Sequence, residues 1–280
     1  MRIDLHTHSS ASDGTESPAE VMAAAARSGL DVVALTDHDT TSGWDEAAAA
    51  AVDVGVALMR GTEVSARLHG ISVHLLAYLQ DPTHPELMVE LERTRSARER
   101  RGRLIVDLLA ADYPLTWDDV LAQTAPNTVV GRPHIADALV AAGFLPDRSA
   151  AFAGVLSSHA KYYVPYYAPS AIDAVRAVRA AGGVPVFAHP GAEVRGRIVP
   201  DEAFDELADA GLAGIEIDHR DHTLAERARL HAIAARLGLL VTGSSDYHGA
   251  GKENLLGENL TAPDVLVAIE EQGALEVVRA

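Results

Sequence analysis

The amino-acid sequence predicts an α/β fold built on a parallel sheet, either open or closed into a barrel. Short apolar runs of strand length alternate with longer Ala-rich runs of helix length along most of the chain. Polar side chains follow several of the apolar runs directly, as they do at the carboxyl ends of strands in α/β domains. The chain has 280 residues, 48% of them hydrophobic, which is enough to bury a large core. Strands that alternate with helices in this way normally pair in parallel.

In roughly the first third of the chain, the pattern predicts four strands and two helices. The first helix has clear boundary signals, because Ser17 is a suitable N-cap residue and Gly29 a suitable stop. The predicted strands cover residues 2–6, 31–36, 56–59 and 71–78, and the predicted helices cover residues 18–28 and 43–53.

The later part of the chain repeats the alternation. Gly182 and Gly183 separate the first helix of this part from the strand that follows it. The predicted helices cover residues 172–181, 201–210 and 223–237, and the predicted strands cover residues 184–188, 214–217 and 239–242.

Between these parts, residues 85–163 are predicted to be mostly helical. A long helix over 86–110 contains an Arg/Glu-rich segment, 92–103, which we interpret as a solvated face with ion pairs four residues apart. Proline then separates shorter helices at positions 114, 126, 133 and 146. We interpret this region as a helical insertion: residues 1–84 and 166–280 form a catalytic domain, and residues 85–165 form a substrate-binding domain.

Composition limits the possible classes of protein. Without cysteine there is no disulfide and no thiolate zinc site, so any bound metal needs nitrogen and oxygen ligands. No apolar run is long enough for a transmembrane helix, and the first residues do not resemble a signal peptide, so we expect a cytoplasmic protein. The net charge of −17 argues against nonspecific nucleic-acid binding. It does not exclude an anionic substrate, because bound cations would reverse the local sign.

Two motifs in the first 40 residues contain candidate metal ligands. His6 and His8 are two residues apart on a predicted strand, so both rings point to the same side. Asp13 follows in a Ser-rich loop, where its alternative role is to form a turn beside Gly14. His38 lies just after the strand over 31–36, between two aspartates that are either partners of the ligands or helix caps.

Further candidates lie in or after the later strands. Glu63 follows a strand, whereas His74 lies inside an apolar strand, where a histidine is more often a satisfied core residue. His189 follows the strand over 184–188. Imidazole and carboxylate without thiolate suit a catalytic site for Zn²⁺, Mn²⁺ or Fe²⁺. Nine candidates are too many for one ion, so two or three ions that share a carboxylate are predicted, with these ligands: His6, His8, Asp13, His38, Glu63, His74, His189, Asp246 and His248.

In order and context, these motifs resemble those of the polymerase and histidinol phosphatase (PHP) family. The resemblance covers residues 1 to about 260. It implies a distorted, TIM-like (β/α)₇ barrel with the helical insertion, and a centre of three metal ions. It also implies three sets of ligands: one of His6, His8, Glu63 and Asp246, one of Glu63, His74 and His189, and one of Asp13, His38 and His248.

The insertion resembles one subgroup of this family. Residues 131–134 (GRPH) and 161–165 (KYYVP) resemble motifs of the 3′,5′-nucleotide bisphosphate phosphatases and of the related 5′-to-3′ exoribonuclease RNase AM. By this resemblance, Arg132, His134 and Lys161 line the mouth and bind substrate phosphate. The alternative for Arg132 is a structural ion pair. Lys252 could also touch phosphate, although a solvated loop lysine is the simpler interpretation.

The predicted reaction is metal-assisted hydrolysis of a phosphate ester by water, with His189 or His134 giving a proton to the leaving oxygen. The predicted substrate is a nucleotide with 3′- and 5′-phosphates or a short 5′-phosphorylated RNA; no membrane and no protein partner is indicated. Alternatives are a phosphodiesterase for cyclic or other small phosphates, a histidinol phosphatase, an amide or lactone hydrolase, and a non-enzymatic metal-binding module.

Overall fold

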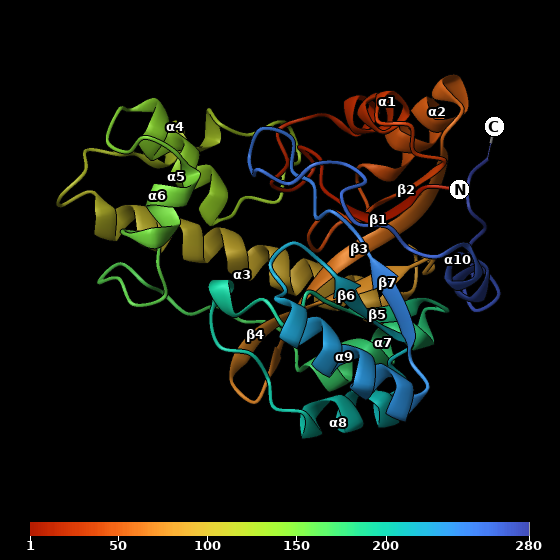
Figure 1. Cartoon of the computed structure of the whole chain (residues 1–280). Helices are drawn as coiled ribbons and strands as arrows, with labels where there is room; N and C mark the ends of the chain where they lie inside the picture. Colours follow the sequence, from red (N-terminus) through yellow and green to blue (C-terminus); the bar gives the residue numbers. More distant parts are fainter. Residues whose placement is uncertain (280) are drawn as a thin grey trace.

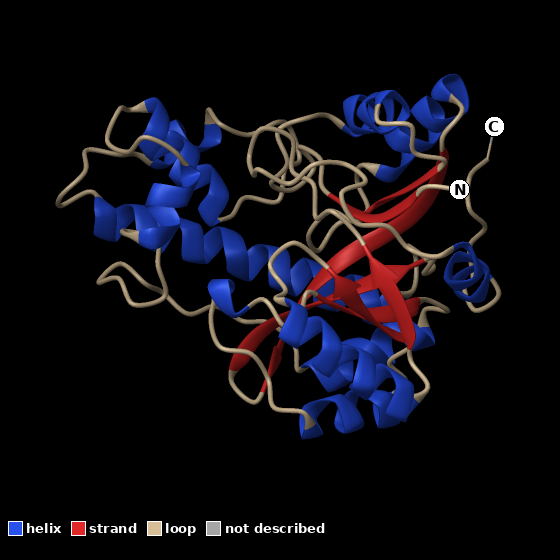
Figure 2. Cartoon of the chain, in the orientation of Figure 1, coloured by secondary structure: helices blue, strands red, loops and turns tan. Residues whose placement is uncertain are grey.

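A single seven-stranded sheet forms the centre of the computed structural model, which describes residues 1–279 (Figures 1 and 2). The strands are hydrogen-bonded in the order in which they follow one another along the chain. They are β1 (Ile3–Thr7), β2 (Val32–Leu35), β3 (Ala57–Leu68), β4 (Ile71–Tyr78), β5 (Val184–Ala188), β6 (Gly214–Asp218) and β7 (Leu240–Gly243).

The two ends of the sheet meet, so the sheet is nearly closed into a barrel. The backbone N–H of His8, just after β1, donates to the carbonyl of Tyr247, just after β7, at 2.8 Å. Thr7 and Tyr247 form a parallel bridge at the same place. The predicted barrel-like α/β fold is therefore confirmed.

The prediction that all strands pair in parallel is wrong for β4. This strand is antiparallel to both of its neighbours, β3 and β5, whereas the remaining pairs are parallel. The cause is the tight turn at His69 and Gly70, both with positive φ, which joins β3 to β4 directly. A parallel connection needs a crossover of a dozen or more residues, and two residues permit only a hairpin. For the same reason β3 is longer than predicted, because its second half pairs with β4.

Helices cover the outside of the sheet (Figure 1). The predicted helices are present, and α10 was missed. A capping box between Ser17 and Glu20 fixes the start of α1. No helix within residues 1–279 has the length and apolar character needed to cross a membrane. The covering helices are α1 (Pro18–Arg27), α2 (Trp44–Val54), α7 (Ala171–Ala180), α8 (Glu202–Ala210), α9 (Leu224–Leu237) and α10 (Pro263–Glu270), with a short 3₁₀ helix, η1 (Glu193–Arg195).

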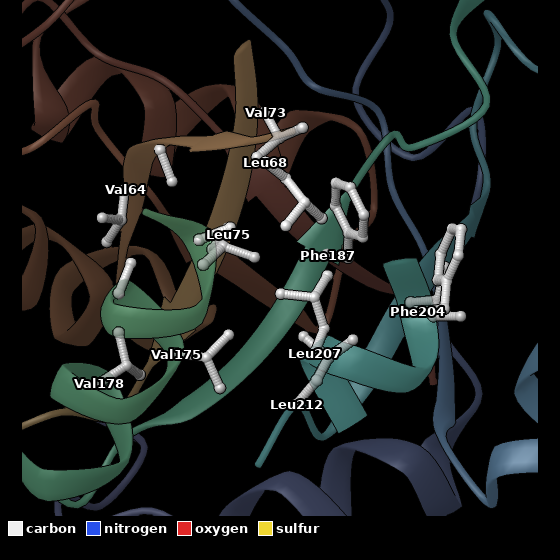
Figure 3. Close-up of a cluster of buried hydrophobic side chains, with 14 of the residues drawn as sticks. Val64, Leu68, Val73, Leu75, Val175, Val178, Phe187, Phe204, Leu207 and Leu212 are labelled. Atoms are coloured by element: carbon white, nitrogen blue, oxygen red, sulfur yellow. The ribbon is translucent and has the colours of Figure 1, made fainter. Parts of the chain in front are cut away.

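The largest hydrophobic cluster lies between strands β3 to β6 and helices α7 to α9 (Figure 3). The rings of Phe187 on β5 and Phe204 on α8 lie 5.4 Å apart within this cluster. On the inner side of the sheet, the buried Tyr78 hydroxyl donates to the carbonyl of Leu5 at 2.8 Å. Both faces of the sheet are therefore packed, which holds the strand ends in fixed positions.

The region between β4 and α7 contains helices α3 (Pro85–Leu109), α4 (Trp117–Leu121), α5 (Arg132–Ala141) and α6 (Arg148–Ala153). The end of α3 packs with the later helices in a hydrophobic cluster formed only by residues 105–164, including Ile105 and Leu139. Figure 1 shows α4 to α6 on the opposite side of the sheet from α10. The division into domains at residues 84/85 and 165/166 stays a prediction.

We expect Phe204→Ala to lower the free energy of unfolding by about 3–5 kcal/mol, because Phe204 is fully buried against Phe187. Val52→Ala on the exposed face of α2 is the matched control, with an expected change within about 0.5 kcal/mol. Urea unfolding followed by circular dichroism measures both. Equal effects of the two substitutions would contradict this description of the core.

Candidate metal centre

The nine predicted ligands come from all but one of the strands and meet at one end of the barrel. His6 is within β1, Glu63 within β3 and His74 within β4, so the sheet itself holds these three. The other six lie in loops that follow strands: His8, Asp13, His38, His189, Asp246 and His248.

The backbone at three of these strand ends is left-handed, although none of the residues is glycine. Asp39, His189 and Asp246 have φ values of 54°, 33° and 54°. Non-glycine residues adopt this conformation at a cost and keep it where the surroundings impose it, often at functional sites.

The carboxylate of Glu63 lies at the centre of the site and is almost completely buried. Its Oε2 atom is 3.0 Å from Nε2 of His8, 3.2 Å from Nε2 of His6 and 3.3 Å from Nδ1 of His38. Its Oε1 atom is 2.8 Å from Nδ1 of His74 and 3.0 Å from Nε2 of His189. Each oxygen therefore faces its own group of imidazoles, as expected for a carboxylate shared by two cations.

The first predicted set is brought together as a compact cluster. Potential ligand atoms of His6, His8, Glu63 and Asp246 all lie within 4.8 Å of one another. Nε2 of His6 and Nε2 of His8 are 3.0 Å apart, and Oδ1 of Asp246 is 3.4 and 3.5 Å from them. Two imidazole nitrogens and two carboxylates directed at one point form a ligand set that suits a divalent cation.

The third predicted set also converges. Oδ1 of Asp13 is 3.3 Å from Nε2 of His248, and Oδ2 of Asp13 is 3.8 Å from Nε2 of His38. His38 lies between clusters, because its ring groups both with His8 and Asp13 and with Glu63 and His74.

Two buried imidazole nitrogens indicate that the site binds metal cations. Nδ1 of His38 and Nε2 of His248 are buried and have no hydrogen-bond partner within residues 1–279. An unpaired buried nitrogen is costly unless a group that the protein itself does not supply binds it. These atoms point at carboxylates in a thiolate-free cluster, so the residues present fit a site for several divalent metal ions.

Charge and burial set the protonation of the site. Burial lowers the pKa of His189 to about 3 and that of His248 to about 4, so both rings are neutral, the form that binds a metal. Burial also disfavours a proton on His8, but Asp246 and Glu63 outweigh it and raise its pKa to about 9. Burial would raise the pKa of Glu63, yet the surrounding histidines hold it well below its usual range.

Glu216 is a buried residue of the site that the sequence analysis did not single out. Its carboxylate accepts a hydrogen bond from Nδ1 of His6 at 3.0 Å and from the backbone N–H of His189 at 2.7 Å, and the Ser244 hydroxyl also donates to it. Because Nδ1 of His6 is held in this way, Nε2 faces the cluster. The available signal was a charged residue inside the apolar strand over 214–217.

Two positively charged side chains, Arg195 and Lys252, bind the Oδ2 atom of Asp246. Arg195 is 2.7 Å and Lys252 is 2.9 Å from Oδ2. Lys252 is therefore not simply a solvated loop lysine. Arg195 also pairs with Asp221 at 2.7 Å, which ties the loop after β5 to the loop after β6.

The aspartates on either side of His38 hold neighbouring segments of the chain in place. Asp37 accepts hydrogen bonds from the backbone and hydroxyl of Ser9, at 2.8 and 2.7 Å. Asp39 accepts from the backbone and hydroxyl of Ser65, both at 2.8 Å, and pairs with Arg98 of α3 at 2.9 Å.

The three residues of the insertion that were predicted to bind substrate phosphate do not lie together. Arg132 is half-buried and donates to the carbonyl of Leu156 at 3.0 Å. His134 is buried, and its Nδ1 accepts from the backbone N–H of Gly131 at 3.1 Å.

Lys161, by contrast, is exposed and pairs with Asp112 at 2.7 Å. Asp112 lies beyond the C-terminal end of α3. That end of the helix is about 16 Å along the axis from Arg98, which contacts the site. The structure therefore does not bring Lys161 to the ligand clusters. The roles of these three residues towards substrate, and of His189 or His134 as proton donor, stay predictions.

A nearly closed α/β barrel with buried imidazole and carboxylate clusters at its strand ends defines a class of metal-dependent hydrolases. The model of the PHP domain matches residues 4–104, which include six of the nine predicted ligands: His6, His8, Asp13, His38, Glu63 and His74. The chain belongs to the PHP-domain family and is a metal-dependent phosphoesterase.

Three relatives resemble the chain over most of its length. A 3′,5′-nucleoside bisphosphate phosphatase of Chromobacterium violaceum is 35% identical over 89% of this chain and 88% of its own. A 5′-3′ exoribonuclease of Haemophilus influenzae is 33% identical over 97% of this chain and 98% of its own. A phosphoribosyl 1,2-cyclic phosphate 1,2-diphosphodiesterase of Eggerthella lenta is 35% identical over 89% of this chain and 95% of its own.

Two solved structures are similar in fold. A Bifidobacterium adolescentis protein assigned to the metal-dependent phosphoesterases superposes with a TM-score of 0.95, at 48% identity, over 97% of this chain and 96% of its own. A Chromobacterium violaceum protein described as an amidohydrolase, with bound sulfate and without metal, superposes with a TM-score of 0.87, at 32% identity, over 100% of this chain and 98% of its own.

We expect metal binding to release protons at neutral pH. The pKa of metal-free His8 is about 9, so its ring is protonated at pH 7, whereas a metal ligand must be neutral. Metal affinity should therefore rise as the pH increases from 6 towards 9. Calorimetric Mn²⁺ titrations in two buffers of different ionisation enthalpy measure the released protons. An affinity that stays constant over this range would contradict the expectation.

We expect Glu216→Gln to weaken metal binding about 10- to 100-fold while the chain stays folded, because the amide no longer holds His6 as a carboxylate does. Glu99→Gln on the exposed side of α3 is the control, with no expected change. Equilibrium dialysis against Mn²⁺ compares the two variants. Unchanged binding by Glu216→Gln would show that the carboxylate does not orient the ligand.

Proposed function

We propose that this phosphoesterase hydrolyses a nucleotide substrate that carries a second phosphate, either a 3′,5′-bisphosphate nucleotide or a short 5′-phosphorylated RNA. The observation that carries the proposal is a group of buried and half-buried arginines beside the metal clusters. Arg98, Arg101 and Arg132 all come from the insertion. A substrate with a single phosphate would use the metal clusters alone and leave this group without a function.

The arginine group has too few carboxylates of its own. Arg98 pairs with Asp39 at 2.9 Å and donates to the hydroxyl of Ser65 at 2.5 Å. Arg101 donates to the carbonyl of Val164 at 2.6 Å. The neighbours with the largest effects on the pKa of Arg101 are Arg132, Tyr166, Tyr163 and Arg98.

Such a group favours an anion. Burial, together with the positive charge of nearby Arg132, lowers the pKa of Arg101 to about 10, because like charges repel in a place with little water. Burial likewise lowers the pKa of Arg132. A phosphate bound between these guanidinium groups would relieve the repulsion and form charge-assisted hydrogen bonds.

The barrel would supply the reaction centre. The three predicted ligand sets would hold two or three ions of Mn²⁺, Fe²⁺ or Zn²⁺, all of which accept these ligands. When bound, such ions neutralise charge on the phosphoryl oxygens and lower the pKa of a water molecule. Glu63 and Glu216 keep the imidazoles oriented, and Arg195 and Lys252 hold Asp246 from the outside. The insertion arginines bind the second phosphate and so fix which ester bond reaches the metals.

The names of two relatives support a nucleotide or RNA substrate, because one is a 3′,5′-nucleoside bisphosphate phosphatase and another a 5′-3′ exoribonuclease. The second candidate is hydrolysis of a small cyclic phosphodiester, which is favoured by the 35% identity to a cyclic phosphate diesterase. Amide hydrolysis is a weaker alternative, since a neutral amide would not use the arginine group. A histidinol phosphatase would also leave it unused.

We expect Arg132→Ala to lower kcat/KM for 3′,5′-bisphosphate nucleotides by about 10- to 150-fold, the loss of one charged hydrogen-bonded contact. Turnover of an aryl phosphate, which has no second phosphate, should change less than about threefold. The assay uses the Mn²⁺-loaded enzyme with a panel of bisphosphate nucleotide, 5′-phosphorylated oligoribonucleotide, cyclic phosphate, histidinol phosphate and aryl phosphate.

Arg103→Ala is the control within the insertion, because Arg103 lies on the exposed face of α3 and pairs with Glu99. Equal losses on bisphosphate and aryl phosphate would remove the proposed role of the arginine group. Highest activity on the cyclic phosphate would favour the second candidate instead.

A further inference from the structure

The loop that carries Asp13 is held on one side by the helical insertion. The barrel side of this loop is fixed by Asp37, which accepts hydrogen bonds from Ser9 and Ser12. On the opposite side, donors from the insertion bind the backbone carbonyls of the loop: Thr128 Oγ1 to Ser10 at 2.6 Å, the Val129 N–H to Ala11 at 3.0 Å and Arg148 Nη1 to Asp13 at 2.9 Å.

Arg148 is the best-defined of these donors. It lies at the start of α6, and its Nε and Nη2 atoms bind the two carboxylate oxygens of Asp137 on α5 at 2.5 and 2.6 Å. This bidentate pair orients the guanidinium group, so Nη1 points at the carbonyl of Asp13. The side chain is only 13% exposed, so the contacts are shielded from water.

A third segment closes around the same guanidinium group. A Cβ atom at Gly251 would lie 2.2 Å from Nη1 of Arg148, so only glycine fits there without displacing it. Gly251 belongs to the loop that carries His248, and its N–H donates to the His248 carbonyl at 3.2 Å. Thr15 links the two loops, since its N–H donates to the same carbonyl at 3.1 Å.

We propose that Arg148 is a positioning residue that makes the insertion part of the third cation position. By holding the carbonyl of Asp13, Arg148 keeps the Asp13 carboxylate 3.3 Å from Nε2 of His248. The inference rests on the proposed function, because it takes Asp13, His38 and His248 as the ligands of one ion.

The effect is selective for one ion. Glu63, His6 and His74 lie within strands, where ladder hydrogen bonds hold them without help from the insertion. Asp13 lies in a loop without such a ladder. Loss of the Arg148 contacts therefore frees the third position and leaves the other two intact. The insertion thus connects substrate binding by its arginines with occupancy of a cation position in the barrel.

The test counts bound Mn²⁺ in the full-length chain by mass spectrometry of the metal after equilibrium dialysis at graded Mn²⁺ concentrations. For a wild type that binds three ions, Arg148→Ala and Gly251→Ala should each weaken the third by about 10- to 100-fold and leave the first two unchanged. Added guanidinium ion should restore the third ion to Arg148→Ala but not to Asp13→Ala. Arg103→Ala, an exposed arginine of the insertion, is the control and should bind as the wild type does.

Each other outcome has a definite meaning. In one outcome, Asp13→Ala loses one ion, whereas Arg148→Ala and Gly251→Ala both keep all three ions at wild-type affinity. The inference about Arg148 is then wrong, and the proposed ligand sets stand. If Asp13→Ala and His248→Ala keep every ion, the ligand assignment under the proposed function fails first. Loss of all ions in Gly251→Ala, which leaves every ligand and Arg148 in the chain, would mean general damage to the site and would also overturn the selective role.

Discussion

A buried carboxylate surrounded by imidazoles is the constraint on which the rest of the structure depends. Glu63 is 1% exposed, and five histidine rings lie within 3.3 Å of its two oxygens. A carboxylate so far from water is stable only with positive charge beside it, supplied by protonated histidine or by metal ions. The rings belong to four different strands or the loops after them, so the barrel has to close for the site to form.

The hairpin of β3 and β4 is how the fold meets this constraint. Glu63 pairs with Leu76 and Ser65 pairs with His74, so the imidazole lies one diagonal step from the carboxylate across the antiparallel pair. On its other side, the end of β2 runs along β3, and His38 forms a bridge with Glu63. The departure from an all-parallel barrel therefore places His74 beside Glu63, which a helical crossover at this point would have separated.

The barrel and its ligand types were predictable because their signals are local. Polar residues after buried apolar runs marked most of the strand ends, and the structure brings the nine predicted ligands together. The antiparallel direction of β4 was missed because no strand was predicted between residues 60 and 70. The turn at His69 and Gly70 therefore was not recognised as the turn of a hairpin. Arg148 was missed because its partner, the Asp13 carbonyl, lies 135 residues away, which no local pattern reveals. Glu216 had a local signal as a charge inside an apolar strand, but its partner His6 lies 210 residues away.

The most direct test of the account is anomalous diffraction from crystals of this chain grown with Mn²⁺. The account predicts strong anomalous peaks between Glu63 and the surrounding rings, with at least two ions sharing its carboxylate and a further one between Asp13 and His248. Manganese bound only at surface carboxylates, with the imidazoles still hydrogen-bonded to Glu63, would contradict it. In that case the buried cluster would be a structural network of ion pairs, and the chain would lack the metal centre that phosphoester hydrolysis requires here.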